Sequence, residues 1–118
     1  MEINETTVAI CMATYNGEQY LIQQIDSILN QTYNNWVLFI RDDGSLDSTP
    51  GIIQQYAMKY QGKIILIADP TLTGGSAKKN FAAILYWVKQ HYSFRYFMFA
   101  DQDDVWLDFK IEKSMQLL

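Results

Sequence analysis

The regular alternation of short apolar runs with helical segments is the feature that most constrains the fold. The apolar runs predict strands at 6–13, 35–43, 63–68 and 94–100. Between and after them, amphipathic patterns predict helices at 18–31, from 47 or 48 to about 60, at 77–91 and at 109–118. This order is typical of βαβ units. We therefore predict one α/β domain over residues 1–118, a Rossmann-like parallel sheet with helices on both faces.

The loops that follow the predicted strands carry an excess of acidic residues. In a parallel sheet with right-handed crossovers the carboxyl ends of all strands lie on one edge, where open α/β sheets bind ligands. The four loops at this edge read TYNGE, RDDGSLDS, DPTLTGGSAKKN and DQDD, and they hold more than half of the 13 acidic residues. This clustering indicates a ligand site at the carboxyl edge.

Asp101 and Asp103 follow the last apolar run directly. In an extended backbone the side chains of residues i and i+2 share a face, so the two carboxylates can bind one hard cation such as Mg²⁺ or Mn²⁺. The alternative is that Asp103 or Asp104 caps the helix that follows. A calcium-binding EF-hand loop is excluded, because Trp106 occupies the position that requires glycine.

Asp42 and Asp43 end the second predicted strand. An acid at this position binds a nucleoside hydroxyl in dinucleotide-binding folds, and the alternative is an Asx turn before Gly44. The chain contains neither G-x-G-x-x-G after its first strand nor a P-loop. A nucleotide site here would therefore need a cation to neutralise the phosphates.

Net charge, cysteine content and hydropathy argue against several classes of protein. A net charge of −4 and a pI near 4.7 argue against nucleic-acid binding through a basic surface. Cys11, the single cysteine, lies in an apolar run and is expected to be a buried thiol, which fits a reducing cytoplasm. We expect no signal peptide, because the first ten residues lack a basic segment, and no apolar stretch approaches the ~20 residues of a membrane span.

A few single residues remain open to two interpretations. Tyr15 either packs in the first loop or stacks on a base. Lys78 and Lys79 either form a solvated helix face or face a phosphate. His91 is expected at the surface, and the tryptophans Trp36 and Trp87 are expected to pack in the core.

Four segments, in order and spacing, resemble family 2 glycosyltransferases of the GT-A fold. They are VAICMATYNGEQYLIQQIDSILNQTY, WVLFIRDDGSLDST, GGSAKKNFAAIL and FADQDDVW, and they cover nearly the whole chain. DQDDVW with IRDDGSLDSTP most resembles the rhamnosyltransferase-like branch, which builds bacterial cell-surface polysaccharides. The resemblance implies an inverting transfer of a sugar, such as rhamnose, from a nucleoside-diphosphate sugar of the UDP or dTDP type to a glycan or lipid-linked acceptor.

The resemblance also implies a role for particular residues. Thr14 and Tyr15 would line the base pocket, Asp43 would accept the imide N–H of uracil or thymine, and Asp42 would support the turn. Asp103 would bind Mn²⁺ or Mg²⁺ directly, and Asp101 would contact ribose or a metal-bound water. The remaining residues expected to contact the nucleotide sugar are Asn16, Glu18, Lys79, Asn80 and Gln102.

The family's general base and acceptor pocket lie beyond the matched segments. We therefore expect both beyond Leu118, and expect this chain to be a donor-binding part that does not transfer sugar alone. The resemblance further implies a cytoplasmic protein with peripheral contact at the inner face of the cell membrane. Two other classes remain as alternatives, a nucleotidyltransferase-like enzyme and a non-catalytic nucleotide-binding module.

Overall fold

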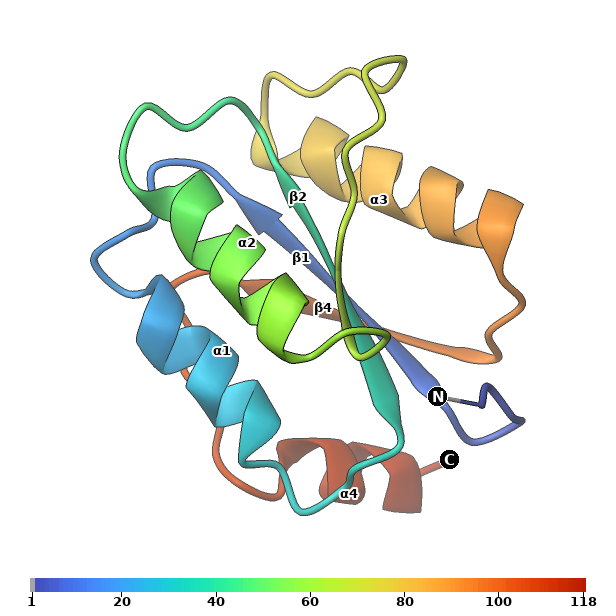
Figure 1. The fold of residues 1–118 in the computed structure, drawn as a ribbon. Coiled ribbons are helices and arrows are strands. Elements are labelled where there is room, and N and C mark those ends of the chain that lie inside the picture. The colour runs from blue at the N-terminus through green and yellow to red at the C-terminus, as the bar shows by residue number, and fades with distance from the viewer. Residues whose placement is uncertain (1) are drawn as a thin grey trace.

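The computed structural model describes residues 2–118 and confirms the predicted α/β fold (Figure 1). A four-stranded sheet alternates with helices along the chain. In chain order the elements are β1 (Val8–Thr14), α1 (Leu21–Leu29), β2 (Trp36–Asp42), α2 (Thr49–Lys59), β3 (Ile64–Leu66), α3 (Ala77–His91), β4 (Tyr96–Asp101) and α4 (Lys110–Gln116).

The strand order β3-β2-β1-β4 places β1 inside the sheet, with a parallel partner on each side. The chain adds β2 and β3 on one side of β1 and then crosses over to add β4 on the other. The register pairs Thr14 with Asp42 on one side and Ala13 with Asp101 on the other. The direction in which strands are added thus reverses between β1 and β4, which makes this position a topological switch point, where ligands bind in folds of this kind.

Side chains of β1 alternate between two apolar layers. Val8, Ile10 and Met12 pack in one cluster with residues of α1, α2 and α4, while Ala9 and Cys11 pack in a second cluster with α3. Both faces of the strand are thus covered, which explains why its sequence is apolar at consecutive positions rather than at alternate ones.

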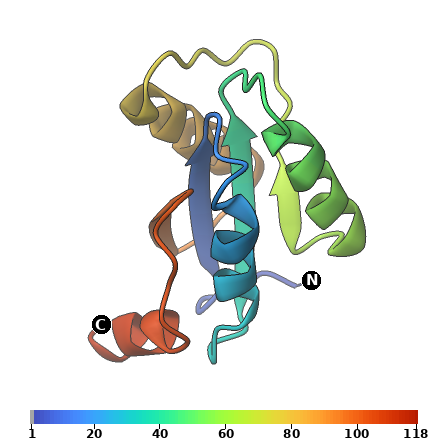
Figure 2. The same cartoon turned by 90° about the vertical axis from the view of Figure 1, so that its left-hand side faces the viewer.

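After β4 the chain runs back beside α1 to α4, which lies at the amino-terminal end of the sheet (Figure 2). Trp106 and Ile111 of this returning segment are buried in the α1 layer. The helix begins at Lys110 after its N-cap Phe109, and no side chain caps it. The alternative interpretation, that Asp103 or Asp104 caps this helix, is therefore wrong, because the helix starts several residues later.

Most other boundaries also differ from the predicted ones by one to three residues, and two elements illustrate this. The third strand is shorter than 63–68, since within residues 2–118 this edge strand pairs with β2 alone, over Ile64–Leu66. The first helix begins at Leu21 rather than Glu18, because residues 18–20 form a turn and the N-cap Tyr20 has a φ of −121°, outside the helical range. The predicted range 77–91 of the third helix is confirmed.

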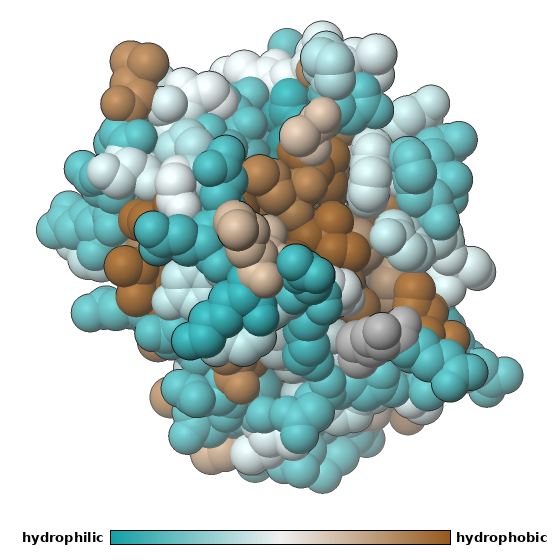
Figure 3. All heavy atoms as spheres, viewed as in Figure 1, coloured by the Kyte–Doolittle hydropathy of each residue, from teal (hydrophilic) through white to brown (hydrophobic). Residues whose placement is uncertain are grey.

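The surface shows where the sheet is least covered. Apolar residues gather between α2 and α3 on the face drawn in Figure 3, with hydrophilic residues around them. Within residues 2–118, β4 pairs only with β1, and Phe99 on this edge is exposed. None of the helices in the described part of the chain is long and apolar enough to cross a membrane.

The buried thiol of Cys11 provides a test of the α3 layer. Burial raises the pKa of this thiol to about 12, and the residue has no exposed surface. Because the thiolate is the reactive form, we expect the native protein to resist iodoacetamide at pH 8 while urea-unfolded protein is fully alkylated. Mass spectrometry measures both, and rapid alkylation of native protein would show that α3 does not cover β1 as described.

Candidate functional site

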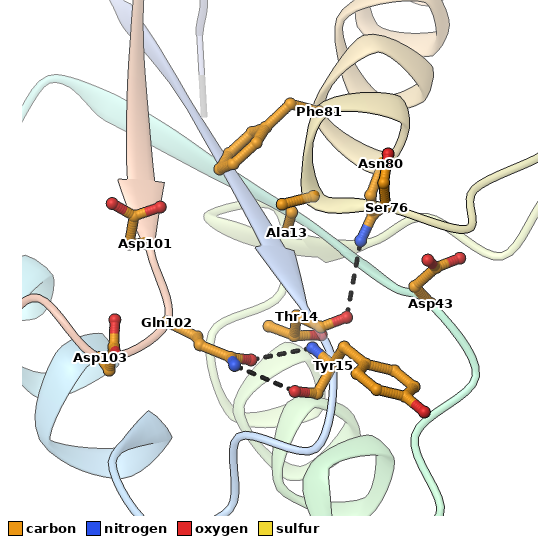
Figure 4. Close-up of a pocket in the computed structure, with 11 residues that line it drawn as sticks. Ala13, Thr14, Tyr15, Asp43, Ser76, Asn80, Phe81, Asp101, Gln102 and Asp103 are labelled. Atoms are coloured by element: carbon orange, nitrogen blue, oxygen red, sulfur yellow. Dashed lines mark hydrogen bonds between the residues drawn. The ribbon is translucent and has the colours of Figure 1, made fainter.

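A pocket of about 290 Å³ opens at the switch point, between the carboxyl ends of β1 and β4 and the start of α3 (Figure 4). A second hollow of about 350 Å³ shares its Tyr15, Asp43, Ser76 and Ala77 walls, so the two form one groove. The predicted site residues that line the first pocket are Thr14, Tyr15, Asp43, Asn80, Asp101, Gln102 and Asp103. Asn16, Glu18, Asp42 and Lys79 lie outside its lining.

Asp101 and Asp103 form the acidic wall of the pocket. β4 ends at Asp101, and Gln102 and Asp103 lie in a turn, so the extended spacing assumed from the sequence does not continue past the strand. Both carboxylates nevertheless line the pocket and are exposed. No group of three His, Cys, Asp or Glu side chains within residues 2–118 is arranged to hold a metal ion. The chain alone thus offers two carboxylates to a cation, and further ligands would have to come from a bound molecule or water.

Gln102 joins the loops that follow β1 and β4 at the switch point. Its Oε1 accepts from the backbone N–H of Tyr15 (2.8 Å), and its Nε2 donates to the carbonyl of Tyr15 (3.0 Å) (Figure 4). The side-chain amide thus replaces the ladder that a continuing strand would form. A Cβ at Gly17 would overlap the Gln102 amide, so a larger residue there would displace this side chain from its bonds to Tyr15.

Asp43 is held by an ion pair and a backbone donor. Arg41 Nη1 lies 3.3 Å from Asp43 Oδ1, and the N–H of Gly75 donates to Oδ2 (2.8 Å). The same Nη1 donates to Asn80 Oδ1 (2.8 Å). These bonds join β2 to the loop before α3 and to α3 itself, so they fix the orientation of Asp43 within the groove.

Asn80 is buried, and its amide is occupied within the protein. Its Nδ2 donates to the carbonyl of Arg41 (3.1 Å) and makes a longer bond to that of Thr14 (3.5 Å). With Oδ1 accepting from Arg41, the amide holds β1, β2 and α3 together at the floor of the pocket.

Gly74 and Gly75, which precede α3, let the backbone of this loop lie against the Asp43 carboxylate. A Cβ at Gly74 would overlap the Asp43 carboxylate, and Gly75 has a φ of +108°, which L residues rarely adopt. Ser76 then caps α3 by accepting from the backbone N–H of Lys79 (3.1 Å).

Asp42 points into its own turn rather than into the pocket. Its Oδ1 accepts from the hydroxyls of Thr14 (2.8 Å) and Ser45 (2.6 Å), and its Oδ2 accepts from the N–H of Ser45 (2.8 Å). The carboxylate is therefore surrounded by donors of the chain itself and stabilises the turn after β2.

Asn16 and Glu18 join the first loop to the second. Asn16 Oδ1 accepts from the N–H of Leu46 (2.9 Å), and Glu18 Oε2 accepts from the N–H of Ser48 (3.0 Å). Asn16 has a φ of +47°, a conformation that asparagine adopts more readily than most residues. These hydrogen bonds hold the loops after β1 and β2 together, and neither Asn16 nor Glu18 lines the groove.

Lys79 extends away from the pocket. It lines a separate hollow with Thr71, Leu72 and Thr73 and is exposed. Lys78 is exposed as well and lines neither part of the groove. The acidic wall therefore has no lysine facing it from the start of α3.

Sequence reasoning missed Arg41, Ser76 and Phe81 as parts of the site. Ser76 and Phe81 line the pocket, and Arg41 donates a hydrogen bond to Asn80 at the floor of the pocket. A basic residue directly before an acidic pair at a strand end was a signal for Arg41. The pair Gly74-Gly75 before a helix was a signal for a close backbone approach. Phe81 carried no distinguishing signal, because it has the spacing of an ordinary helix core residue.

Comparison with known proteins identifies relatives with the same sequence pattern. Residues 9–118 match the family described as Glycosyl transferase family 2. The chain is 37% identical to EpsE of Bacillus subtilis over 94% of this chain and 38% of the relative. It is 36% identical to the dTDP-rhamnosyl transferase RfbG of Shigella flexneri over 91% of this chain and 36% of RfbG. The chain thus spans well under half the length of these curated relatives.

Solved structures share the fold. TarS residues 1–349 of S. aureus superpose with a TM-score of 0.72 at 21% identity, over 93% of this chain and 31% of TarS. The mannosyltransferase PcManGT of Pyrobaculum calidifontis, in complex with GDP-Man and Mn²⁺, gives a TM-score of 0.65 at 22% identity, over 84% of this chain and 28% of PcManGT. Because the family match extends over nearly the whole chain, this protein belongs to glycosyl transferase family 2.

Proposed function

We propose that this chain is the donor-binding part of an inverting glycosyltransferase that uses a UDP- or dTDP-sugar. The observation that carries the proposal is the groove at the switch point. It has an aromatic ring and a fixed hydrogen-bond acceptor at one end and two exposed carboxylates at the other. A nucleoside diphosphate has the matching order of groups, a flat base, a ribose and two phosphates that bind a cation.

In this proposal the base binds in the hollow bounded by Tyr15, Asp43 and Gly75. Tyr15 is half exposed and can stack on a base, and ionised Asp43 can only accept hydrogen bonds. Uracil and thymine present an N–H donor at N3, whereas cytosine presents an acceptor there. The ion pair with Arg41 keeps Asp43 in one orientation, so recognition needs little rearrangement.

Asp103 is proposed to bind Mn²⁺ or Mg²⁺ directly. Asp101 is proposed to bind the same cation, directly or through a metal-bound water, or to contact the ribose. Two exposed carboxylates in a turn suit a cation that shares its remaining positions with phosphate oxygens and water. When bound, the cation would neutralise the diphosphate and stabilise the charge that develops on the leaving group. The structure of PcManGT was determined with GDP-Man and Mn²⁺, which supports metal dependence in this fold.

We propose that the general base and the acceptor pocket both lie outside residues 1–118. Asp42 is surrounded by its own hydroxyl and amide donors, and Asp43 is ion-paired with Arg41. Asp101 and Asp103 are assigned to the cation. These four carboxylates are thus already committed, so we expect this chain to bind donor but not to transfer sugar by itself.

The acceptor is proposed to be a glycan or lipid-linked sugar of the bacterial cell surface, at the cytoplasmic face of the membrane. RfbG is named as a dTDP-rhamnosyl transferase, and the E. coli relative WfgD, 29% identical, is named for a diphosphoundecaprenol-linked acceptor. A structure of TarS was solved with UDP. These names support rhamnose or another hexose as the transferred sugar.

Replacing Asp43 tests the base pocket. Losing a partly buried acceptor of a base N–H costs about 1–3 kcal/mol, so Asp43→Ala should weaken UDP or dTDP roughly 5- to 150-fold in calorimetric titrations. Asp69→Ala is a matched control, because it removes an acid from the same edge of the sheet but outside the groove. The Asp69 carboxylate accepts hydrogen bonds from Thr71, which lower its pKa. Equal affinity of Asp43→Ala and the parent would place Asp43 outside the nucleotide site.

Replacing Asp103 tests the cation site. Asp103→Asn keeps the shape of the side chain but removes the charge, so UDP affinity in Mn²⁺ should fall about tenfold or more. Affinity in EDTA should not fall, because the carboxylate repels the phosphates when no cation is present. Asp104→Asn is the control, since Asp104 is adjacent and exposed but does not line the pocket. If both variants bind Mn²⁺ and UDP as well as the parent, the metal assignment is wrong.

A further inference from the structure

Three polar side chains are buried along α1 and the turn that follows it. The exposed fractions of Gln24, Ser27 and Gln31 are 0%, 7% and 3%. These polar side chains are thus as buried as the apolar residues of α1 that face the core. A buried polar side chain is costly unless it is hydrogen-bonded. Their bonding partners therefore show what these residues do.

These three side chains bond to the backbone of residues 101–111. Gln24 Nε2 donates to the carbonyl of Asp101 (2.7 Å), and Ser27 Oγ accepts from the N–H of Trp106 (3.0 Å). Gln31 Nε2 donates to the carbonyl of Leu107 (2.7 Å), and its Oε1 accepts from the N–H of Ile111 (3.1 Å). We call Gln24, Ser27 and Gln31 the polar seam.

The polar seam compensates for the irregular structure of the segment it contacts. From Gln102 to Phe109 the chain forms neither strand nor helix, so its backbone groups have no regular ladder. The seam provides donors and acceptors in chain order, because the segment runs beside α1 from the carboxyl edge of the sheet to α4 (Figure 2). The Ser27 hydroxyl also lies 2.9 Å from Gln24 Oε1, which links two of the three members.

One member of the seam acts directly on the acidic wall of the pocket, and Gln102 is held from the other side. Gln24 holds the carbonyl of Asp101, and Gln102 is held by the backbone of Tyr15. The backbone on both sides of the Asp101 and Asp103 side chains is thus constrained, while both carboxylates remain exposed to a ligand. Such an arrangement prepares two ligands at a fixed spacing before the cation arrives.

We propose that Gln24, Ser27 and Gln31 are positioning residues that hold the acidic segment 101–111 ready for a cation. The link to the cation rests on the proposed function, and the positioning of the segment itself does not. The seam touches neither the groove nor the reacting atoms. Its effect passes through the backbone of residues 101–111, which carries Asp101 and Asp103, so it should change metal-dependent binding more than binding of the nucleotide without metal.

The test compares Gln24→Leu with Gln23→Leu. Gln23 is the preceding residue of the same helix and is exposed, so the two variants make the same change with and without loss of the seam. For each variant, calorimetry measures UDP affinity in Mn²⁺ and in EDTA, and the ratio of the two is the metal gain. We expect Gln24→Leu to lower the metal gain about tenfold and Gln23→Leu to leave it within twofold. An equal loss in both conditions would show a purely structural role and overturn the proposal.

A second variant and a ligand-free measurement cover the remaining outcomes. Ser27→Ala removes a single hydroxyl, so it serves if Gln24→Leu does not fold, and it should lower the metal gain in the same way. Amide hydrogen exchange without ligand should become faster at Trp106 in Ser27→Ala, with exchange in α3 unchanged. If the parent shows no metal gain, the proposed function fails, while faster exchange at Trp106 still supports positioning of the segment. Unchanged exchange at Trp106 in Ser27→Ala would show that the seam does not hold the segment and would overturn the positioning proposal.

Discussion

The position of β1 inside a parallel sheet is the constraint on which the rest of the structure depends. All residues from Val8 to Thr14 are buried, and the strand pairs with β2 on one side and β4 on the other. Parallel pairing on both sides brings three strand ends to one edge, at the point where the direction of strand addition reverses. The groove lies there, between the ends of β1 and β4 and the start of α3, and the amide of Gln102 bridges the loops that follow the two strands.

Hydrogen bonding divides the acids at this edge into two kinds. The Asp42 carboxylate is surrounded by donors from Thr14 and Ser45, and Asp43 is paired with Arg41 and Gly75, so these two shape the site and orient one acceptor. The carboxylates of Asp101 and Asp103 are exposed instead. A carboxylate already bonded within the chain gains less from a cation than an exposed one does, which is why we propose the cation site at the end of β4 rather than at the end of β2.

The fold and the location of the site could be predicted because both follow from local patterns. Apolar runs and helical stripes predict the strands and helices, and parallel topology brings the acidic loops to one edge. The roles of particular side chains depend on tertiary contacts that no local pattern encodes. Asn80 and Gln102 are polar residues near the site, and only the structure shows that their amides bond to the backbone of neighbouring loops. Likewise, Gln24 looks like a surface residue of an amphipathic helix until its partner, the carbonyl of Asp101, is known.

The central claim is that the groove between β1, β4 and α3 binds a nucleoside diphosphate together with a divalent cation. A crystal structure of the chain with UDP and Mn²⁺, with anomalous data that locate manganese, tests this most directly. We expect manganese at Asp103, next to Asp101 and the diphosphate oxygens, with the uracil between Tyr15 and Gly75 and its N3–H directed at Asp43. Manganese away from both carboxylates, or UDP bound outside this groove, would contradict it.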